Sequence, residues 1–301
     1  LLYFNTKLSS YKNVEEGSVY SFIVLLFHSS NGSKDLYSTD EYKSYKYAQE
    51  LYDKQKYSAA QAYFKEIINE IPNTQDELRI NAEYYFAVCA LRLYHHNVET
   101  LLTRFVLDHP DHPKSERVYL QLARHYYRMK KFTKSIEYFE KIDQYDLSIE
   151  DQNEFLFKLG YSKFMRKKKD EAKVNFNELL QRKSDYKVPA TYYYSHIAYE
   201  EGKYQTALVG FRSISKSKMF KSIIPYYITQ ILYQQHKYDD LIAYAPVHID
   251  SVIEKRKGEF AKLIGDSYYK NQDYIKAIDY YKAFKKYAKA DRESNYQVAF
   301  S

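Results

Sequence analysis

Aromatic, small and polar residues recur along the chain in a fixed order. The repeated motif consists of a basic or polar residue, an aromatic residue, two polar residues and a small residue. A second aromatic residue follows four positions after the small one. The first copy reads KYSAA at 56–60, with Ala59 in place of the second polar residue, and is followed by Phe64. Four further copies, one of them without the first aromatic residue, lie at 131–135, 168–172, 203–207 and 273–277.

The small residue of each copy measures the interval between copies. These residues are Ala60, Ser135, Ala172, Ala207 and Ala277, with Leu241 in a degenerate copy. Successive differences are 75, 37, 35, 34 and 36 residues, and 75 is two periods with one weak copy hidden between them. A period of this length is that of a helix-turn-helix repeat. The sequence therefore predicts about seven paired helices.

Small residues let the two antiparallel helices of a hairpin approach each other closely. The first helix carries a matching small residue twelve positions earlier in six of the units, at Ala48, Ala87, Ala123, Gly160, Ser195 and Gly265. The aromatic residue four positions after the small residue of the second helix lies on the same face and fills the gap to its neighbour. We therefore predict that the hairpins are packed by Ala60, Phe64, Ser135, Phe139, Gly160, Ala172, Phe176, Ala207, Phe211, Gly265, Ala277 and Tyr281.

These positions resemble the tetratricopeptide repeat family over about Asp40 to Ser301. The family's pattern of small, aromatic and small residues recurs in five good copies, and Pro72 stands where the family's closing proline belongs. The chain departs from the family in having no tryptophan, and its second and sixth copies, around His96 and Tyr238, are degenerate and could be bent. The resemblance implies an all-α fold, an α-solenoid of about seven hairpins, that binds proteins and has no catalytic activity.

The tyrosine-rich first helices suggest a narrower likeness. Short motifs such as EYY at 83–85 and FKLGY at 157–161 resemble the tyrosine-rich sequences of the long envelope repeat proteins of Bacteroidetes-type bacteria. This likeness implies an exported protein that faces the periplasm or the outer membrane and acts as a scaffold in assembly there.

The first 39 residues lie outside the repeat array. Residues 19–27 (VYSFIVLLF) form a semi-apolar run that is too short to span a bilayer as a helix and is followed by small and polar residues. We predict a signal peptide over about 18–33, disorder in the rest of 1–39, and the repeat array over 40–301; a disordered or helical N-terminal cap is the alternative. The chain lacks an initial methionine, so we expect that residues 1 to about 17 are an upstream read-through or that the true start is missing. It ends in the apolar stretch 298–300, so we expect further repeats to follow.

Two stripes along the first helices are mostly aromatic. They lie three positions before and four positions after the small residue, and in the tetratricopeptide family the first helices line the inner groove. Tyrosine combines a large contact area with few rotatable bonds and a hydroxyl group, as recognition surfaces require. We predict that a protein or peptide binds in a groove lined by Tyr45, Tyr52, Tyr84, Tyr127, Phe157, Phe164, Tyr192, Tyr199, Tyr226, Tyr233 and Tyr269. The alternative is that individual rings pack between adjacent hairpins.

Charge and composition argue against several other classes of protein. The net charge is +7, from 46 basic and 39 acidic residues, but the two signs are interspersed, which is typical of a solvated helical surface and not of a nucleic-acid-binding stripe. A single cysteine, Cys89, excludes an internal disulfide and lies in an apolar segment. His95, His96, His109 and His112 are interpreted as helix ends and loops, so no metal site is predicted. No phosphate loop or catalytic motif is present, and we expect neither a cofactor nor enzymatic activity.

Three functions remain open at this point. The first is an exported scaffold that binds a protein or peptide of the envelope, in the periplasm or at the outer membrane, with no transmembrane helix in the mature chain. The second is a cytoplasmic adaptor with the same fold. The third is a glycan- or peptidoglycan-associated envelope module whose tyrosines stack on sugars.

Overall fold

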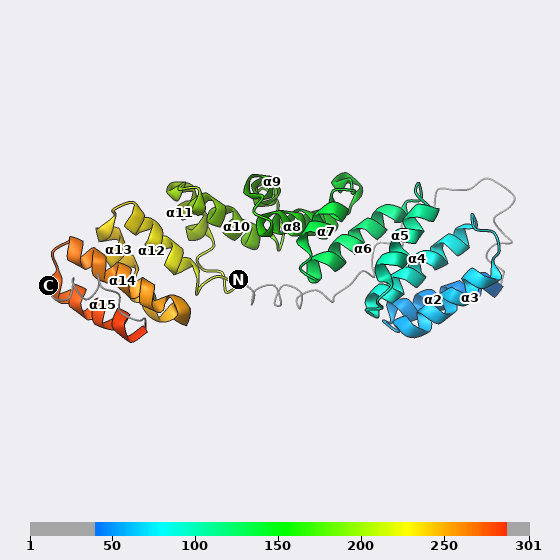
Figure 1. Cartoon of the computed structure of the whole chain (residues 1–301), viewed down its shortest axis with the longest axis horizontal. Helices are drawn as coiled ribbons and strands as arrows, with labels where there is room; N and C mark the ends of the chain where they lie inside the picture. The colour runs from blue at the N-terminus through cyan, green and yellow to red at the C-terminus, as the bar shows by residue number, and fades with distance from the viewer. Residues whose placement is uncertain (1–39, 288–301) are drawn as a thin grey trace. The chain divides into compact units, whose positions relative to one another are not determined.

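The computed structural model describes residues 40–287, and this part of the chain is helical and contains no strand (Figure 1). The predicted all-α fold class is confirmed. The predicted signal peptide at 18–33, the remainder of 1–39 and the chain end at 288–301 lie outside the described residues. Two compact units divide the chain at His125, which we call the first unit (described from 40 to 125) and the second unit (described from 126 to 287).

Helices follow one another in hairpins joined by short turns. The first unit contains α2 (Asp40–Asp53), α3 (Tyr57–Glu70), α4 (Glu77–Arg92), α5 (Val98–Asp108) and most of α6 (Lys114–Arg128). The second unit contains α7 (Phe132–Phe139), η2 (Gln144–Asp146), α8 (Ile149–Met165), α9 (Lys169–Leu180), α10 (Lys187–Glu200), α11 (Tyr204–Ser213), α12 (Ile224–Gln234), α13 (Tyr238–Tyr244), η3 (Pro246–Ser251), α14 (Glu254–Lys270) and α15 (Tyr274–Tyr287). Within each unit, neighbouring helices in the sequence make the most extensive packing contacts.

Every described hairpin turns at a residue in the left-handed backbone conformation. In the six hairpins whose first helix carries a small residue, this turn residue lies seven positions after it. The turn residues have φ between 56° and 73° and are Gln55, Tyr94, Lys130, Lys167, Gly202, His236 and Gln272. The amide that follows donates to the carbonyl five positions back, as Lys168 N does to Lys163 O at 2.9 Å. This is the Schellman arrangement that ends a helix. The turns of the two degenerate copies, at Tyr94 and His236, therefore keep the geometry of the regular ones.

Aromatic rings meet across five of these turns. One ring lies near the end of the first helix, and the other is the first residue of the second helix. The centroids are 5.3 to 6.2 Å apart in the pairs Tyr52–Tyr57, Tyr127–Phe132, Tyr199–Tyr204, Tyr233–Tyr238 and Tyr269–Tyr274. Such edge-on or tilted contacts are the favoured geometry of aromatic pairs. They hold the two helices of a hairpin together next to the turn.

All twelve residues assigned to hairpin packing are buried. In α9, for example, Ala172 and Phe176 are both fully buried. Close approach explains the glycine at Gly265 in α14, because a Cβ atom there would lie 2.8 Å from the ring of Tyr281 in α15. The Tyr281 hydroxyl donates to Asp266 at 2.9 Å, so the buried ring also satisfies its polar atom.

The degenerate copies differ from the others in their second helices. In the second copy, α5 begins at Val98, two residues later than the spacing of the other hairpins places it. In the sixth copy, Leu241 occupies the position of the small residue and is fully buried. There α13 has only seven residues, and the chain continues as the 3-10 helix η3 from Pro246. Pro246 has no amide hydrogen to donate to the carbonyl of Ile242, so the α-helical hydrogen bonds of α13 cannot continue through it.

The single cysteine lies inside α4. Cys89 is fully buried, and burial raises the pKa of its thiol to about 12. Its side chain therefore packs as a small apolar group and carries almost no thiolate near neutral pH.

None of the helices between residues 40 and 287 combines the length and the apolar character needed to cross a membrane.

Candidate partner-binding surfaces

The structure divides the eleven predicted groove rings into two groups. Six are buried: Tyr45, Tyr84, Tyr127, Phe157, Tyr192 and Tyr226. Five are half-buried: Tyr52, Phe164, Tyr199, Tyr233 and Tyr269.

The six buried rings are packed against neighbouring side chains and do not line an open groove. Tyr192 stacks on Phe220 with ring centroids 4.3 Å apart. Tyr84 meets Phe105 of α5 edge to face at 5.8 Å. For these six rings the prediction of a groove lining is corrected in favour of the alternative, packing between helices. The half-buried rings stay candidates, although four of them also belong to the aromatic pairs at the turns.

A cluster of aromatic and polar side chains joins the first helices α10, α12 and α14 of the second unit. We call it the Tyr-Arg cluster, and it consists of Tyr199, Tyr226, Tyr227, Gln230, Arg256 and Glu259. At its centre the Arg256 guanidinium lies over the Tyr226 ring, 4.6 Å from the ring centroid. Arg256 also donates to the Tyr226 hydroxyl at 3.3 Å and to Glu259 at 3.0 Å.

Gln230 completes the polar part of the Tyr-Arg cluster. Its amide nitrogen donates to the Tyr226 hydroxyl at 3.0 Å and to Glu259 at 2.8 Å. Gln230 is buried, whereas the side chains of Arg256 and Glu259 are 42% and 46% exposed. The ion pair is therefore screened by water and is worth little as a source of stability. It presents a charged donor and a charged acceptor at the surface, above a buried aromatic base.

Tyr199 extends the Tyr-Arg cluster onto α10. Its ring meets Tyr227 edge to face at 5.5 Å, and Tyr227 stacks on Phe211 at 5.0 Å. Burial raises the pKa of both Tyr199 and Tyr226 above the usual value. These phenols are neutral at physiological pH and act as hydrogen-bonding groups, not as charges.

His196 lies beside the Tyr-Arg cluster on α10. Its ring packs against Tyr227 at 5.3 Å, and Nδ1 is 3.6 Å from Glu200. Burial lowers the pKa of this histidine despite the nearby carboxylate. The neutral imidazole is therefore favoured, and the ring serves as part of the packing beneath the cluster.

Sequence reasoning missed the polar members of the Tyr-Arg cluster. Gln230, Arg256 and Glu259 lie outside the two aromatic stripes, so a search for rings passes over them. The spacing of Arg256 and Glu259, three residues apart on a predicted helix, is the local signal that an ion pair forms there. No local sequence pattern indicates that Gln230, which lies in another hairpin, forms a hydrogen bond with the Glu259 carboxylate.

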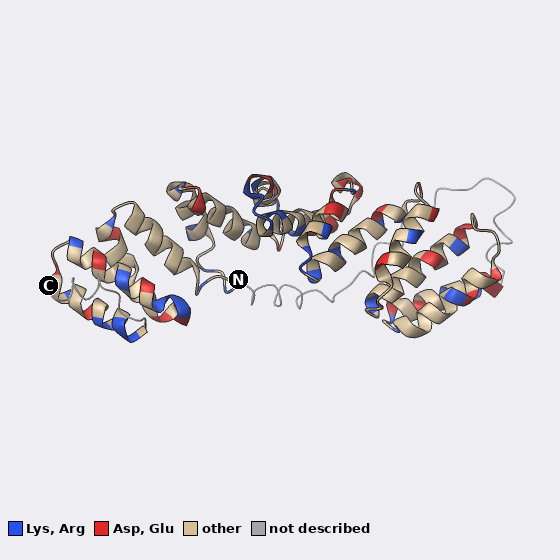
Figure 2. Ribbon diagram, viewed as in Figure 1, with Lys and Arg blue, Asp and Glu red and all other residues tan. Residues whose placement is uncertain are grey.

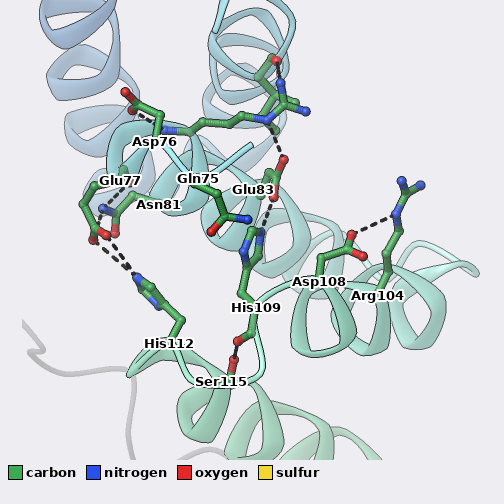
Figure 3. Close-up of polar contacts among 12 residues, drawn as sticks. Gln75, Asp76, Glu77, Asn81, Glu83, Arg104, Asp108, His109, His112 and Ser115 are labelled. Atoms are coloured by element: carbon green, nitrogen blue, oxygen red, sulfur yellow. Dashed lines mark hydrogen bonds and ion pairs between the residues drawn. The ribbon is translucent and has the colours of Figure 1, made fainter. Parts of the chain in front are cut away.

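In the first unit, histidine side chains of the loop between α5 and α6 make polar contacts with α4 (Figure 3). His109 Nε2 lies 2.8 Å from Glu83, whose other oxygen accepts from Arg79 at 3.0 Å. His112 lies 3.3 Å from Glu77, at the start of α4. His109 also caps the C-terminal end of α5, as predicted from the sequence. Between residues 40 and 287, no three His, Cys, Asp or Glu side chains converge as metal ligands would.

Lys114 follows this loop and lies over two tyrosine rings. Its ammonium group is 5.3 Å from the ring centroid of Tyr84 and 5.4 Å from that of Tyr85, and it donates to Asn81. Burial lowers the pKa of Lys114 to about 8. The loop thus contributes polar contacts that hold α4 and α6 together within the first unit.

Comparison with known proteins identifies the repeat. The family model described as the tetratricopeptide repeat matches residues 154–183, which cover most of the hairpin of α8 and α9. The turn geometry and buried small positions of that hairpin recur through both units. The hairpin of α8 and α9 therefore matches the tetratricopeptide repeat, and the other hairpins resemble it in their turns and small positions.

Solved structures share this fold at low sequence identity. A tetratricopeptide repeat protein from Parabacteroides merdae is 14% identical, with a TM-score of 0.47, and the match covers 85% of this chain and 98% of that one. The C-terminal part of a repeat-containing protein from Cytophaga hutchinsonii is 14% identical, with a TM-score of 0.46, covering 88% and 90%. The structure of Naa15/Naa10 bound to HypK-THB gives 11% identity and a TM-score of 0.55, covering 87% of this chain and 39% of that one. No curated protein matches the chain.

Proposed function

We propose that this chain is a non-enzymatic scaffold that holds a segment of a partner protein against the Tyr-Arg cluster. The observation that carries the proposal is the half-exposed Arg256–Glu259 pair above the buried Tyr226 ring, with Tyr199 beside it. Arginine and tyrosine are the residue types that most often dominate binding energy at protein interfaces. The cluster offers a guanidinium, a carboxylate and neutral phenols to a polypeptide main chain or to polar side chains.

The fold supports a scaffold more than a reaction centre. Tetratricopeptide repeat proteins are generally interaction scaffolds, and the structure of Naa15/Naa10 bound to HypK-THB is, by its name, an assembly of proteins. The repeat supplies a rigid row of first helices whose outer residues vary without disturbing the hairpins. We expect the partner to contact several first helices of the second unit at once.

A photo-cross-linking amino acid at position 199 tests this proposal in cells of the source organism. We expect one or a few discrete cross-linked protein species, which are lost when Arg256→Ala is introduced in the same chain. The matched control places the cross-linker at Tyr145, an exposed tyrosine of the second unit (76% exposed) outside the cluster. The same species from both positions, or none from position 199, would contradict the proposal.

We also propose that the protein works in the bacterial envelope. The semi-apolar run at 19–27 supports this part, as does the resemblance in style to envelope repeat proteins. Residues 1–39 fused to a reporter enzyme that is active only after export test it, with Leu25→Lys as the control that interrupts the apolar run. Export of the first fusion and not of the second is expected. An inactive first fusion would favour the cytoplasmic adaptor.

A further inference from the structure

One segment of the second unit carries basic residues with no acidic residue among them. No Asp or Glu occurs between Glu201 and Asp239, while this segment carries Lys216, Lys218 and Lys221 in the connection between α11 and α12. All three lysines are exposed. The connection therefore places positive charge at the surface with no acidic residue near it in the sequence.

The start of α14 adjoins this connection, and the end of α15 lies beside the start of α14. The amide of Ile253, just before α14, donates to the carbonyl of Ser222 at 3.1 Å. At the other side, the Lys257 ammonium of α14 lies 5.6 Å from the ring centroid of Tyr287, the last residue of α15. The first contact places the exposed Lys255 near the connection, and the second places the end of α15, with the exposed Lys285 and Lys286, beside the first turn of α14. Figure 2 shows the blue segments at these adjoining helix ends.

The lysines of this region differ from the densest basic run in the sequence, Arg166 to Lys169. In that run Lys168 pairs with Glu171 at 3.2 Å and Lys169 with Glu200 at 3.1 Å. Among residues 40–287, by contrast, none of the six lysines described above has an acidic partner. The acidic residues Asp250 and Glu254 also lie near the start of α14, where Glu254 pairs with Lys257 and not with these six lysines. The six ammonium groups therefore act on an approaching molecule.

We propose that Lys216, Lys218, Lys221, Lys255, Lys285 and Lys286 form a basic surface that binds an acidic segment of a partner protein. This surface goes beyond the proposed function, because it does not include the Tyr-Arg cluster. It binds its partner through electrostatic attraction between lysines and carboxylates. Lysine presents a flexible point charge and suits carboxylates spread along a chain, whereas bidentate recognition of phosphate favours arginine. Among the large apolar residues of the connection, Ile214 and Phe220 are buried, and Met219 and Ile223 are half-buried. The connection therefore offers no fully exposed large apolar side chain for insertion into lipid.

The test measures binding of a fluorescent oligoglutamate peptide to the full chain by anisotropy. The site variant combines Lys218→Glu with Lys255→Glu. The control combines Lys130→Glu with Lys167→Glu, two exposed lysines at hairpin turns of the second unit, and changes the net charge by the same amount. We expect the site variant to bind about 10-fold more weakly and the control within about 2-fold of the unaltered chain, with binding that weakens as salt is added.

Each other outcome overturns the inference. Equal loss in the two variants would mean that net charge alone attracts the peptide. Binding of vesicles that contain phosphatidylglycerol, or of single-stranded DNA, without binding of the peptide would assign the surface to a membrane or to a nucleic acid. No peptide binding by the unaltered chain, with cross-linking at position 199 intact, would remove this inference and leave the proposed function standing.

Discussion

The two units are built from the same hairpin but differ in the charge they carry. The described part of the first unit has 11 basic and 13 acidic residues, whereas that of the second unit has 30 and 21. In the first unit some ionisable groups are used internally, as in the contacts of His109, Glu83 and Lys114. The second unit leaves several lysines without an acidic partner among the described residues, including the six of the basic surface. A hairpin repeat fixes only a few small, aromatic and turn positions, so the remaining surface can serve different purposes in each unit.

The largest expected effect comes from removing one buried ring in either unit. Phe64 of the first unit and Phe211 of the second are both fully buried, and truncation to alanine leaves a cavity that costs about 3–5 kcal/mol of stability. We expect Phe64→Ala to speed amide hydrogen exchange mainly in the first unit, and Phe211→Ala mainly in the second. Tyr145→Ala, at an exposed site, serves as the control. Equal acceleration in both units by either variant would show that the two unfold as one block.

Gly265→Ala tests the close helix approach in the second unit. The new Cβ atom would lie 2.8 Å from the Tyr281 ring, so the helices must separate or the ring must move, at a cost of about 1–3 kcal/mol. Urea unfolding measures the loss. Adding Tyr281→Leu to the alanine variant should cost less than the sum of the two single changes. Strict additivity would mean that the two side chains do not compete for the same space.

Lys114 should give the first unit a pH dependence of stability that the exposed lysines of the second unit do not give. Its pKa is lowered to about 8 in the folded chain from 10.5, so the unfolded chain binds the extra proton between these values. Stability therefore rises with pH from about 8 towards 10.5 and is lower below pH 8. We expect Lys114→Met to flatten this rise by about 1 kcal/mol between pH 7.5 and 9.5, after allowance for solvent screening. Urea unfolding of Lys255→Met over the same range is the control, and an identical pH profile for the two variants would contradict the prediction.

The smallest effect concerns the left-handed turn residues, which are alike in both units. Lys167 has φ of 63°, and Gly202 has φ of 73° at the equivalent place. Lys167→Gly should raise stability by up to about 1 kcal/mol, and Gly202→Ala should lower it by a similar amount, because only glycine adopts this conformation without strain. Lys168→Gly, one residue further along with a negative φ, should give no gain. Thermal unfolding distinguishes these three variants, and a gain from Lys168→Gly would contradict the explanation.

Much of the fold could be predicted from the sequence because the contacts that define a hairpin are short in sequence and repeat. Ala172 and Phe176 show this, since their interval from Gly160 encodes the meeting of two helices. The exposure of a ring such as Tyr192 could not be predicted in the same way. Its partner Phe220 lies in the next connection, and its burial depends on how that connection folds back.

The candidate surfaces depend on contacts between segments distant in the sequence. Gln230 reaches Glu259 from a different hairpin, and only the folded second unit shows that they share a bond. The same holds for the basic surface, where Ser222 and Ile253 join two segments through main-chain atoms that carry no sequence signal. The pattern of side chains therefore predicts the hairpins. The candidate surfaces could not be predicted, because they depend on how one hairpin packs against the next.

The burial of Cys89 has a practical consequence for experiments on this protein. Its thiol has a pKa of about 12 and no accessible surface, so maleimide reagents should leave it unmodified in the folded chain. A cysteine introduced at an exposed site such as Lys218 or Tyr145 would then be the sole labelled position, without removal of the natural one. Spectroscopic probes can thus be attached singly, and labelling of Cys89 itself would report the opening of α4.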